Sequence, residues 1–201
     1  MILLPRTLLN SGLLWPQWIA VALLLLSIST AAVCAEKPAA DPALLSLLKQ
    51  AAAEADSFDN QYDAEVWLVE KDPALARLVK EPTKRLALLK LIHSEASRAG
   101  LSPEIVLALI EVESHFDSYA VSSAGAQGMM QIMPFWKHEI GRPEDNLINI
   151  QTNLRYGCTI LKYYLDREKG QLADALARYN GSYGQYWYSE RVLDTWAKRW
   201  R

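Results

Sequence analysis

Residues 105–113 form an apolar stretch that ends in two glutamates. Ser102 is a suitable N-cap for a helix, and Pro103 suits the first helical position. The stretch is apolar on nearly every helical face, so the sequence predicts a buried helix interrupted by Glu111 and Glu113. Positions two apart on a helix point in directions that differ by about 200°. At most one of the two glutamates can therefore face a given cleft.

The apolar setting of Glu113 suits it for acid–base chemistry. Burial disfavours the charged form of a carboxyl group and so raises its pKa. A carboxyl group with a pKa near neutrality can donate a proton and later take one back. Glu113 is therefore a candidate general acid, and the alternative is a surface glutamate without a chemical role. Glu111 is expected to be solvated or paired with a cation.

Glu113-Ser114 begins a long pattern. The pattern continues with Phe116-Asp117, Ser122, Gly125-Ala126, Gly128 and Met130-Gln131-Ile132-Met133-Pro134, and then with Asn149-Ile150, Gly157 and Tyr179-Asn180-Gly181. It resembles the signature of the soluble lytic transglycosylases, lysozyme-like enzymes that cleave peptidoglycan and are related to goose-type lysozyme. The resemblance covers roughly residues 86–196. Two departures, Ser118 for the usual proline and Ser182-Tyr183 for small residues, bear on substrate fit.

The resemblance implies an all-α, lysozyme-like domain and a reaction that needs one carboxyl group. In this family the acid protonates the bond between N-acetylmuramic acid and N-acetylglucosamine. The same group then takes the proton of the muramoyl C6 hydroxyl, which closes a 1,6-anhydro ring. Glu113 matches that acid by its place in Glu-Ser. The resemblance implies no cofactor and no metal, and we expect a monomer.

Four further residues match positions at which the family binds substrate. Ser122 matches a serine that orients substrate and the catalytic carboxyl group; the alternatives are a serine that caps a turn and a match of Ser123 to that position instead. Gln131 offers an amide to sugar hydroxyl or acetamido groups, and Met133 offers an adaptable apolar wall. Tyr179 matches a tyrosine whose phenol reaches the active site, with an edge-of-core tyrosine as the alternative. Met129 and Met130 are expected in the core.

Other polar and aromatic residues carry weaker signals. His93, His115 and His138 lack the spacing of a metal site. Asp117 is expected to be a turn residue, and Cys158 is expected to be buried and inert. An aromatic run could stack on sugar rings or pack in the core; its members are Tyr183, Tyr186, Trp187 and Tyr188.

The N-terminal segment is typical of an exported protein. Residues 1–33 hold one charge, Arg6, and an apolar run that leads to small residues. We interpret residues 1–35 as a signal peptide cleaved after Ala35, which predicts a periplasmic location. The alternative is an uncleaved anchor in the inner membrane, and lipidation at Cys34 is disfavoured because Val33 precedes it. A net charge of −2 indicates no nucleic-acid partner.

The remaining chain is expected to be helical throughout. We assign residues 36–82 to a helical extension that either packs on the next domain or docks a partner, and residues 83–201 to the lysozyme-like domain. Helices are expected at 41–55, around 62–68, at 73–79, 84–99, 103–113, 126–133, 149–165, 171–179 and 186–200. No segment alternates over enough residues to predict a strand.

The function favoured by the sequence is that of a lytic transglycosylase that acts on peptidoglycan, including local wall opening for a secretion or conjugation apparatus. A goose-type hydrolase is the alternative within the enzymes, and it needs a second carboxylate, for which only Asp117 and Asp145 offer themselves. A non-catalytic peptidoglycan-binding scaffold is the alternative outside them, and it predicts loss of the acid that Glu113 supplies.

Overall fold

The structure is a computed structural model that describes residue 46 and residues 56–201. The predicted signal peptide lies outside the described residues, as does all of the predicted helix 41–55 except Ser46, which is helical. In the described part the chain is all-α and its only β pairing is two isolated bridges. The helices in chain order are α2 (Gln61–Leu75), α3 (Pro82–Ala99), α4 (Pro103–Ser114), α5 (Trp136–Ile140), α6 (Ile150–Arg167), α7 (Leu172–Asn180), α8 (Trp187–Thr195) and the π-helical turn η1 (Trp196–Trp200).

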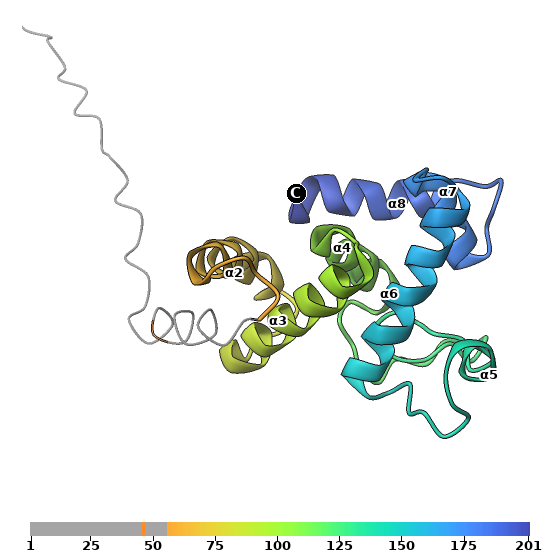
Figure 1. The fold of residues 1–201 in the computed structure, drawn as a ribbon, viewed down its shortest axis with the longest axis horizontal. Helices are drawn as coiled ribbons and strands as arrows, with labels where there is room; N and C mark the ends of the chain where they lie inside the picture. The colour runs from red at the N-terminus through yellow and green to blue at the C-terminus, as the bar shows by residue number, and fades with distance from the viewer. Residues whose placement is uncertain (1–45, 47–55) are drawn as a thin grey trace, which may run out of the picture. The chain divides into compact units, whose positions relative to one another are not determined.

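Helix α4 lies at the centre of the fold, as its apolar sequence predicts. Every residue from Ile105 to Glu111 is buried, and α3, α8 and η1 pack against it. Figure 1 shows α4 between α3 and α8. The Ser102 side chain accepts a hydrogen bond from the Ile105 N–H, so the predicted N-cap is confirmed. At the other end the helix stops at His115, which adopts a left-handed conformation with φ 53°.

Helices α3, α6 and α7 lie within about two residues of their predicted ranges. Gly100 ends α3 and Gly181 ends α7, both at positive φ, and Asn149 caps α6 through its side chain. The last predicted helix is also present, but its final turn widens into the π-helical turn η1. The short helix α5 was not predicted. Within the described residues no helix is both long enough and apolar enough to cross a membrane.

Helix α2 corrects the prediction of a separate helix that starts at Asp72-Pro73. The structure has one continuous helix with Pro73 inside it. A proline removes one helical hydrogen bond, and the burial of Leu68 and Leu75 on either side of it holds the helix together. Asp72 does not cap a new helix, because its carboxylate pairs with the Arg85 guanidinium at 2.7 Å. The helix packs on α3 and on η1, so this described part of the extension lies against the domain.

The segment 116–133 also differs from expectation, because the helix predicted at 126–133 is absent. The chain instead makes turns joined by two bridges, Val121 to Gln127 and Gln127 to Ile132. Gly128 has φ 75° and Gln131 has φ 50°, values that no right-handed helix contains. A Cβ atom on Gly128 would lie 2.5 Å from the Asn153 amide nitrogen, so the backbone needs glycine there.

Asn153 on α6 holds this segment through its side chain, beside the hydrogen bonds that the segment makes within itself. Its side-chain oxygen accepts from the Met130 N–H at 2.7 Å. Its amide nitrogen donates to the carbonyl oxygens of Gln127 and Leu147, each at 2.8 Å. Asn153 is fully buried, so this residue anchors the loop to the core. The loop that follows the Glu113 helix is thereby held in one shape.

Candidate active site

Glu113 lies in the last turn of α4, just before the segment 116–133 that Asn153 anchors to the core, which we call the anchored loop. Its side chain is partly exposed, and the Tyr188 hydroxyl donates a hydrogen bond of 2.5 Å to its Oε1 atom. Burial raises the pKa of Glu113 from its ordinary 4.5 to about 7, while the bond from Tyr188 and the charge of Arg191 lower it in part. A carboxyl group poised near neutrality, as the sequence led us to expect, is therefore present at this position.

Glu111 contacts a different set of residues from Glu113, as expected for helix positions about 200° apart. Its carboxylate is buried and pairs with the Arg199 guanidinium at 2.7 Å. It also accepts a hydrogen bond of 2.8 Å from the Trp200 indole N–H. The expected pairing with a cation is thus confirmed, in a buried rather than a solvated setting. Glu111 ties the end of the chain to α4 and has no free oxygen for chemistry.

Tyr188 is the site residue that sequence reasoning missed. It comes from α8, 75 positions along the chain from Glu113, and is 2% exposed. Tyr183, Tyr186 and Trp187 of the same aromatic run are each at least 44% exposed. One signal was available in the sequence, because Tyr188 alone of these four lies four positions before an aliphatic residue, Val192, in the helix predicted at 186–200. A buried tyrosine needs a partner for its hydroxyl, and here that partner is Glu113.

Tyr179 lies at the end of α7, and its phenol points toward the same region. The hydroxyl donates to the Met130 carbonyl oxygen at 2.7 Å. Burial raises the pKa of Tyr179 well above its usual value, and the negative charge of Glu113 raises it further, so the two side chains lie within electrostatic range. The structure therefore brings Glu113, Tyr179 and Tyr188 together from α4, α7 and α8.

Ser122, Gln131 and Met133 lie on the anchored loop. The Ser122 hydroxyl accepts a hydrogen bond of 3.0 Å from the Ala126 N–H, which is the turn-capping geometry left open as its alternative. The Gln131 amide nitrogen donates to the Ala120 and Gly128 carbonyl oxygens, and its oxygen carries no such bond within the described residues. Met133 is partly exposed. Met129 and Met130 are buried, as predicted.

A bond between Ser114 and the loop fixes where these residues lie relative to Glu113. The Ser114 hydroxyl donates to the Met129 carbonyl oxygen at 2.8 Å. Since Ser114 follows Glu113 directly, the bond joins the end of α4 to the turn that carries Gln131. The serine of the Glu-Ser pair thus serves the placement of the loop.

Asp117 and Asp145, the carboxylates considered for a hydrolase, are both engaged elsewhere. Asp117 accepts a hydrogen bond of 2.9 Å from the Tyr119 N–H, which confirms the expected turn role. Asp145 accepts one of 2.6 Å from the Tyr156 hydroxyl. That bond, together with one from the Arg142 N–H, holds the pKa of Asp145 below its usual value. The lowered pKa of Asp145 contrasts with the raised pKa of Glu113.

The described residues contain no cluster of three or more histidine, cysteine or acidic side chains that could hold a metal ion. His93 stacks on the ring of Phe58, with 3.5 Å between the centroids, and its Nδ1 atom lies 2.8 Å from the Ser57 hydroxyl. Cys158 is fully buried as predicted, and burial raises the pKa of its thiol to about 12. The thiol is therefore uncharged and unreactive at neutral pH.

Comparison with known proteins identifies the family. Residues 90–192, slightly more than half of the chain, match the family model described as the transglycosylase SLT domain. The chain therefore belongs to the transglycosylase SLT domain family. Its all-α, lysozyme-like fold class agrees with the expectation from the sequence.

Two relatives and one solved structure illustrate the similarity. A membrane-bound lytic murein transglycosylase C from Actinobacillus pleuropneumoniae is 48% identical over 46 residues, which are 23% of this chain and 13% of that protein. A membrane-bound lytic murein transglycosylase F from Desulfosudis oleivorans is 35% identical over 98 residues, 47% of this chain and 22% of that protein. An inactive variant of the lytic transglycosylase Slt from Pseudomonas aeruginosa aligns over 80% of this chain and 32% of its own, with 23% identity and a TM-score of 0.43. The chain thus spans less than a quarter of the length of these two relatives.

Proposed function

We propose that this protein is a peptidoglycan lytic transglycosylase that cleaves the β-1,4 bond between N-acetylmuramic acid and N-acetylglucosamine. The observation that carries the proposal is the carboxyl group of Glu113, whose pKa burial raises to about 7 at the end of the central helix. Near neutral pH such a group is present in both its protonated and its ionised form. One residue can therefore serve first as the acid and then as the base.

The reaction needs no second carboxylate and no water. Glu113 protonates the glycosidic oxygen as the bond from that oxygen to the muramoyl C1 atom breaks. The resulting carboxylate then takes the proton of the muramoyl C6 hydroxyl, whose oxygen bonds to C1 and closes the 1,6-anhydro ring. An intramolecular hydroxyl avoids the entropic cost of capturing and orienting a water molecule. The hydrogen bond from Tyr188 engages Oε1, so Oε2 is the oxygen that we assign to proton transfer.

The anchored loop would then form one wall of the substrate cleft. We assign substrate contacts to Ser122, Gln131, Met133 and Tyr179. The Gln131 oxygen, which its two internal hydrogen bonds leave available, can accept from a sugar hydroxyl or an acetamido N–H. A goose-type hydrolase would instead need Asp117 or Asp145 as a base, and both carboxylates are held by other partners.

The domain organisation, the location and the cellular role of the protein are part of the same proposal. We assign residues 1–35 to an export signal, residues 36–82 to a helical extension and residues 83–201 to a domain that acts in the periplasm as a monomer. Local opening of the wall for a secretion or conjugation apparatus is the cellular role that we include in the proposal. The relatives described above are named as membrane-bound proteins, so attachment to the inner membrane is the alternative location.

The test is digestion of purified sacculi, followed by mass spectrometry of the released muropeptides. We expect products that end in 1,6-anhydro-N-acetylmuramic acid, one water lighter than reducing-end products and resistant to borohydride. Glu113→Gln should lower the rate by about 10²–10⁴-fold. Glu144→Gln is the matched control, because the Glu144 side chain is 71% exposed. Mostly reducible products would refute the transglycosylase assignment, and an active Glu113→Gln variant would refute the assignment of the acid.

A further inference from the structure

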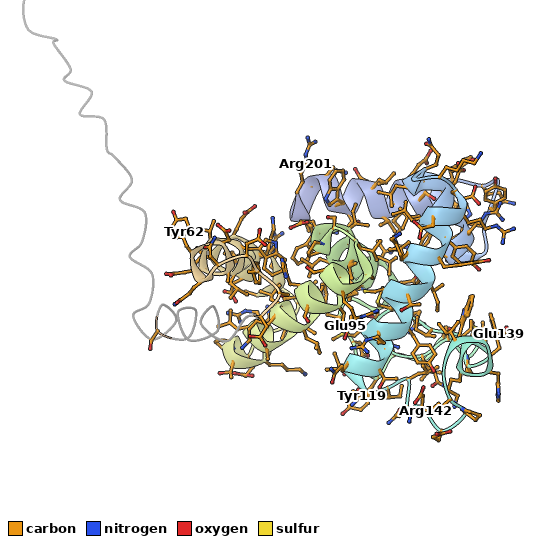
Figure 2. All side chains as sticks on the ribbon, viewed as in Figure 1. Tyr62, Glu95, Tyr119, Glu139, Arg142 and Arg201 are labelled. Carbon is orange, nitrogen blue, oxygen red and sulfur yellow. The ribbon has the colours of Figure 1, made fainter. Side chains whose placement is uncertain are left out.

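Helix α2 has apolar side chains on two opposite sides. One side is buried in the core and carries Ala64, Leu68 and Leu75. The other side carries an exposed row that we call the outer stripe and define as Tyr62, Val66, Val69 and Pro73. Tyr62 is 73% exposed, Val66 is 48% exposed and Val69 is 45% exposed. Figure 2 shows the labelled Tyr62 on the side of α2 that points away from α3.

The spacing of the outer stripe is that of a coiled-coil seam. Its members follow one another at intervals of four, three and four residues, which are the intervals between successive d and a positions of a heptad repeat. At about 100° per residue, they lie within about 60° of one another around the helix axis. Isolated apolar side chains on a surface need no partner, but a row at this spacing is what a helix presents to a second helix or groove. Since α3 and η1 pack on α2 and the outer stripe stays exposed, the seam has room for one more helix.

The positions beside the seam are all acidic. In the heptad register of the outer stripe, the flanking e and g positions are Asp63, Glu65, Glu70 and Asp72. Asp72 is buried and pairs with Arg85, so the first three flank the exposed row. Residues 56–70 hold five acidic residues and no basic one. Lys71, the next residue, pairs with Glu70 and is only 4% exposed. The rim of the outer stripe is therefore acidic.

The charge of this rim determines which surface can cover the outer stripe. A second copy of the chain would bring two acidic rims together, and the anionic headgroups of a bilayer would also repel the rim. In coiled coils, ion pairs between e and g positions across the seam set the choice of partner. We propose that the outer stripe binds a helix of another protein, one with an apolar seam and with lysine or arginine at its e and g positions. The proposal uses no residue of the assigned active site, so it does not depend on the proposed function.

The test measures how the purified protein binds two synthetic helical peptides, each about three heptads long. Both peptides have leucine at their a and d positions, but one has lysine at e and g and the other has glutamate there. Binding is followed by the fluorescence anisotropy of the labelled peptide. Val66→Asp places a charge in the seam, whereas Glu65→Lys reverses one charge of the rim and leaves the seam intact. Ile140→Asp is the matched control, because Ile140 is 45% exposed on α5.

The lysine peptide should bind about 10-fold more tightly than the glutamate peptide, or better. Val66→Asp should weaken binding of the lysine peptide by about 10-fold, because a charge in an apolar seam loses its water without gaining a partner. Glu65→Lys should weaken it by about 2- to 5-fold, and Ile140→Asp should leave it unchanged. Far-ultraviolet circular dichroism checks that each variant is folded.

Several results would overturn the proposal. They include equal binding of the two peptides, no binding of either, and binding of the lysine peptide that neither Val66→Asp nor Glu65→Lys changes. A dimer in sedimentation velocity that Val66→Asp abolishes would assign the outer stripe to a second copy of the chain. Peptide binding seen only after Leu44→Asp and Leu48→Asp are introduced would assign it to residues 41–55 of the same chain.

Discussion

Replacing Glu113 with glutamine should stabilise the fold in a way that depends on pH. Burial raises the pKa of Glu113 to about 7, whereas in the unfolded chain it has its ordinary value of 4.5. Between these two pH values the folded protein binds more protons than the unfolded chain, so the free energy of unfolding falls as pH rises. By pH 7 the free energy of unfolding has fallen by about 3 kcal/mol, because a pKa shift of one unit corresponds to about 1.4 kcal/mol. Below pH 4.5 the loss is absent.

Glutamine removes this loss, because it does not titrate and its side-chain oxygen can still accept the Tyr188 hydrogen bond. We expect equal free energies of unfolding for both proteins at pH 4 and an advantage of about 3 kcal/mol for Glu113→Gln at pH 8. Urea titrations followed by far-ultraviolet circular dichroism measure both values. Every other titrating group is common to the two proteins and cancels in the difference. If the two proteins differed in free energy of unfolding by the same amount at pH 4 and at pH 8, the raised pKa would be refuted. A Glu113→Gln variant that is less stable than the parent at pH 8 would refute it too.

Two further predictions concern the partners of the two glutamates. Tyr188→Phe removes a hydrogen bond that stabilises the Glu113 carboxylate, so the pKa of Glu113 should rise further. The alkaline limb of the pH–rate profile should then move to higher pH, and an unmoved limb would contradict this role. Glu111→Gln leaves Arg199 without its ion-pair partner and should cost about 1–2 kcal/mol of stability in urea titrations at pH 7. Activity per folded molecule should persist, and its loss would show that Glu111 takes part in the chemistry.

The sequence by itself determined the helices whose ends are set locally. Ser102 and Asn149 cap α4 and α6, and Gly100 and Gly181 end α3 and α7. Caps and left-handed glycines act within one helical turn, so they can be recognised in the sequence without knowledge of the tertiary structure. The apolar run before Glu113 likewise predicted a buried helix with a perturbed carboxyl group, because burial on all faces needs no knowledge of the neighbours.

Tertiary contacts determined the features that were predicted wrongly from the sequence or were not predicted at all. The segment 126–133 has helical spacing, but the Asn153 side chain bonds the Met130 N–H and the Gln127 carbonyl oxygen, 23 and 26 positions away, and the remaining bonds close turns and bridges. The helix predicted to start at Pro73 instead continues α2, because the Asp72 carboxylate that would have capped it pairs with Arg85 on α3. Tyr188 meets Glu113 only because α8 packs across the end of α4. Partners so distant in the chain leave no local pattern, since their contact depends on how helices pack and not on the residues beside them.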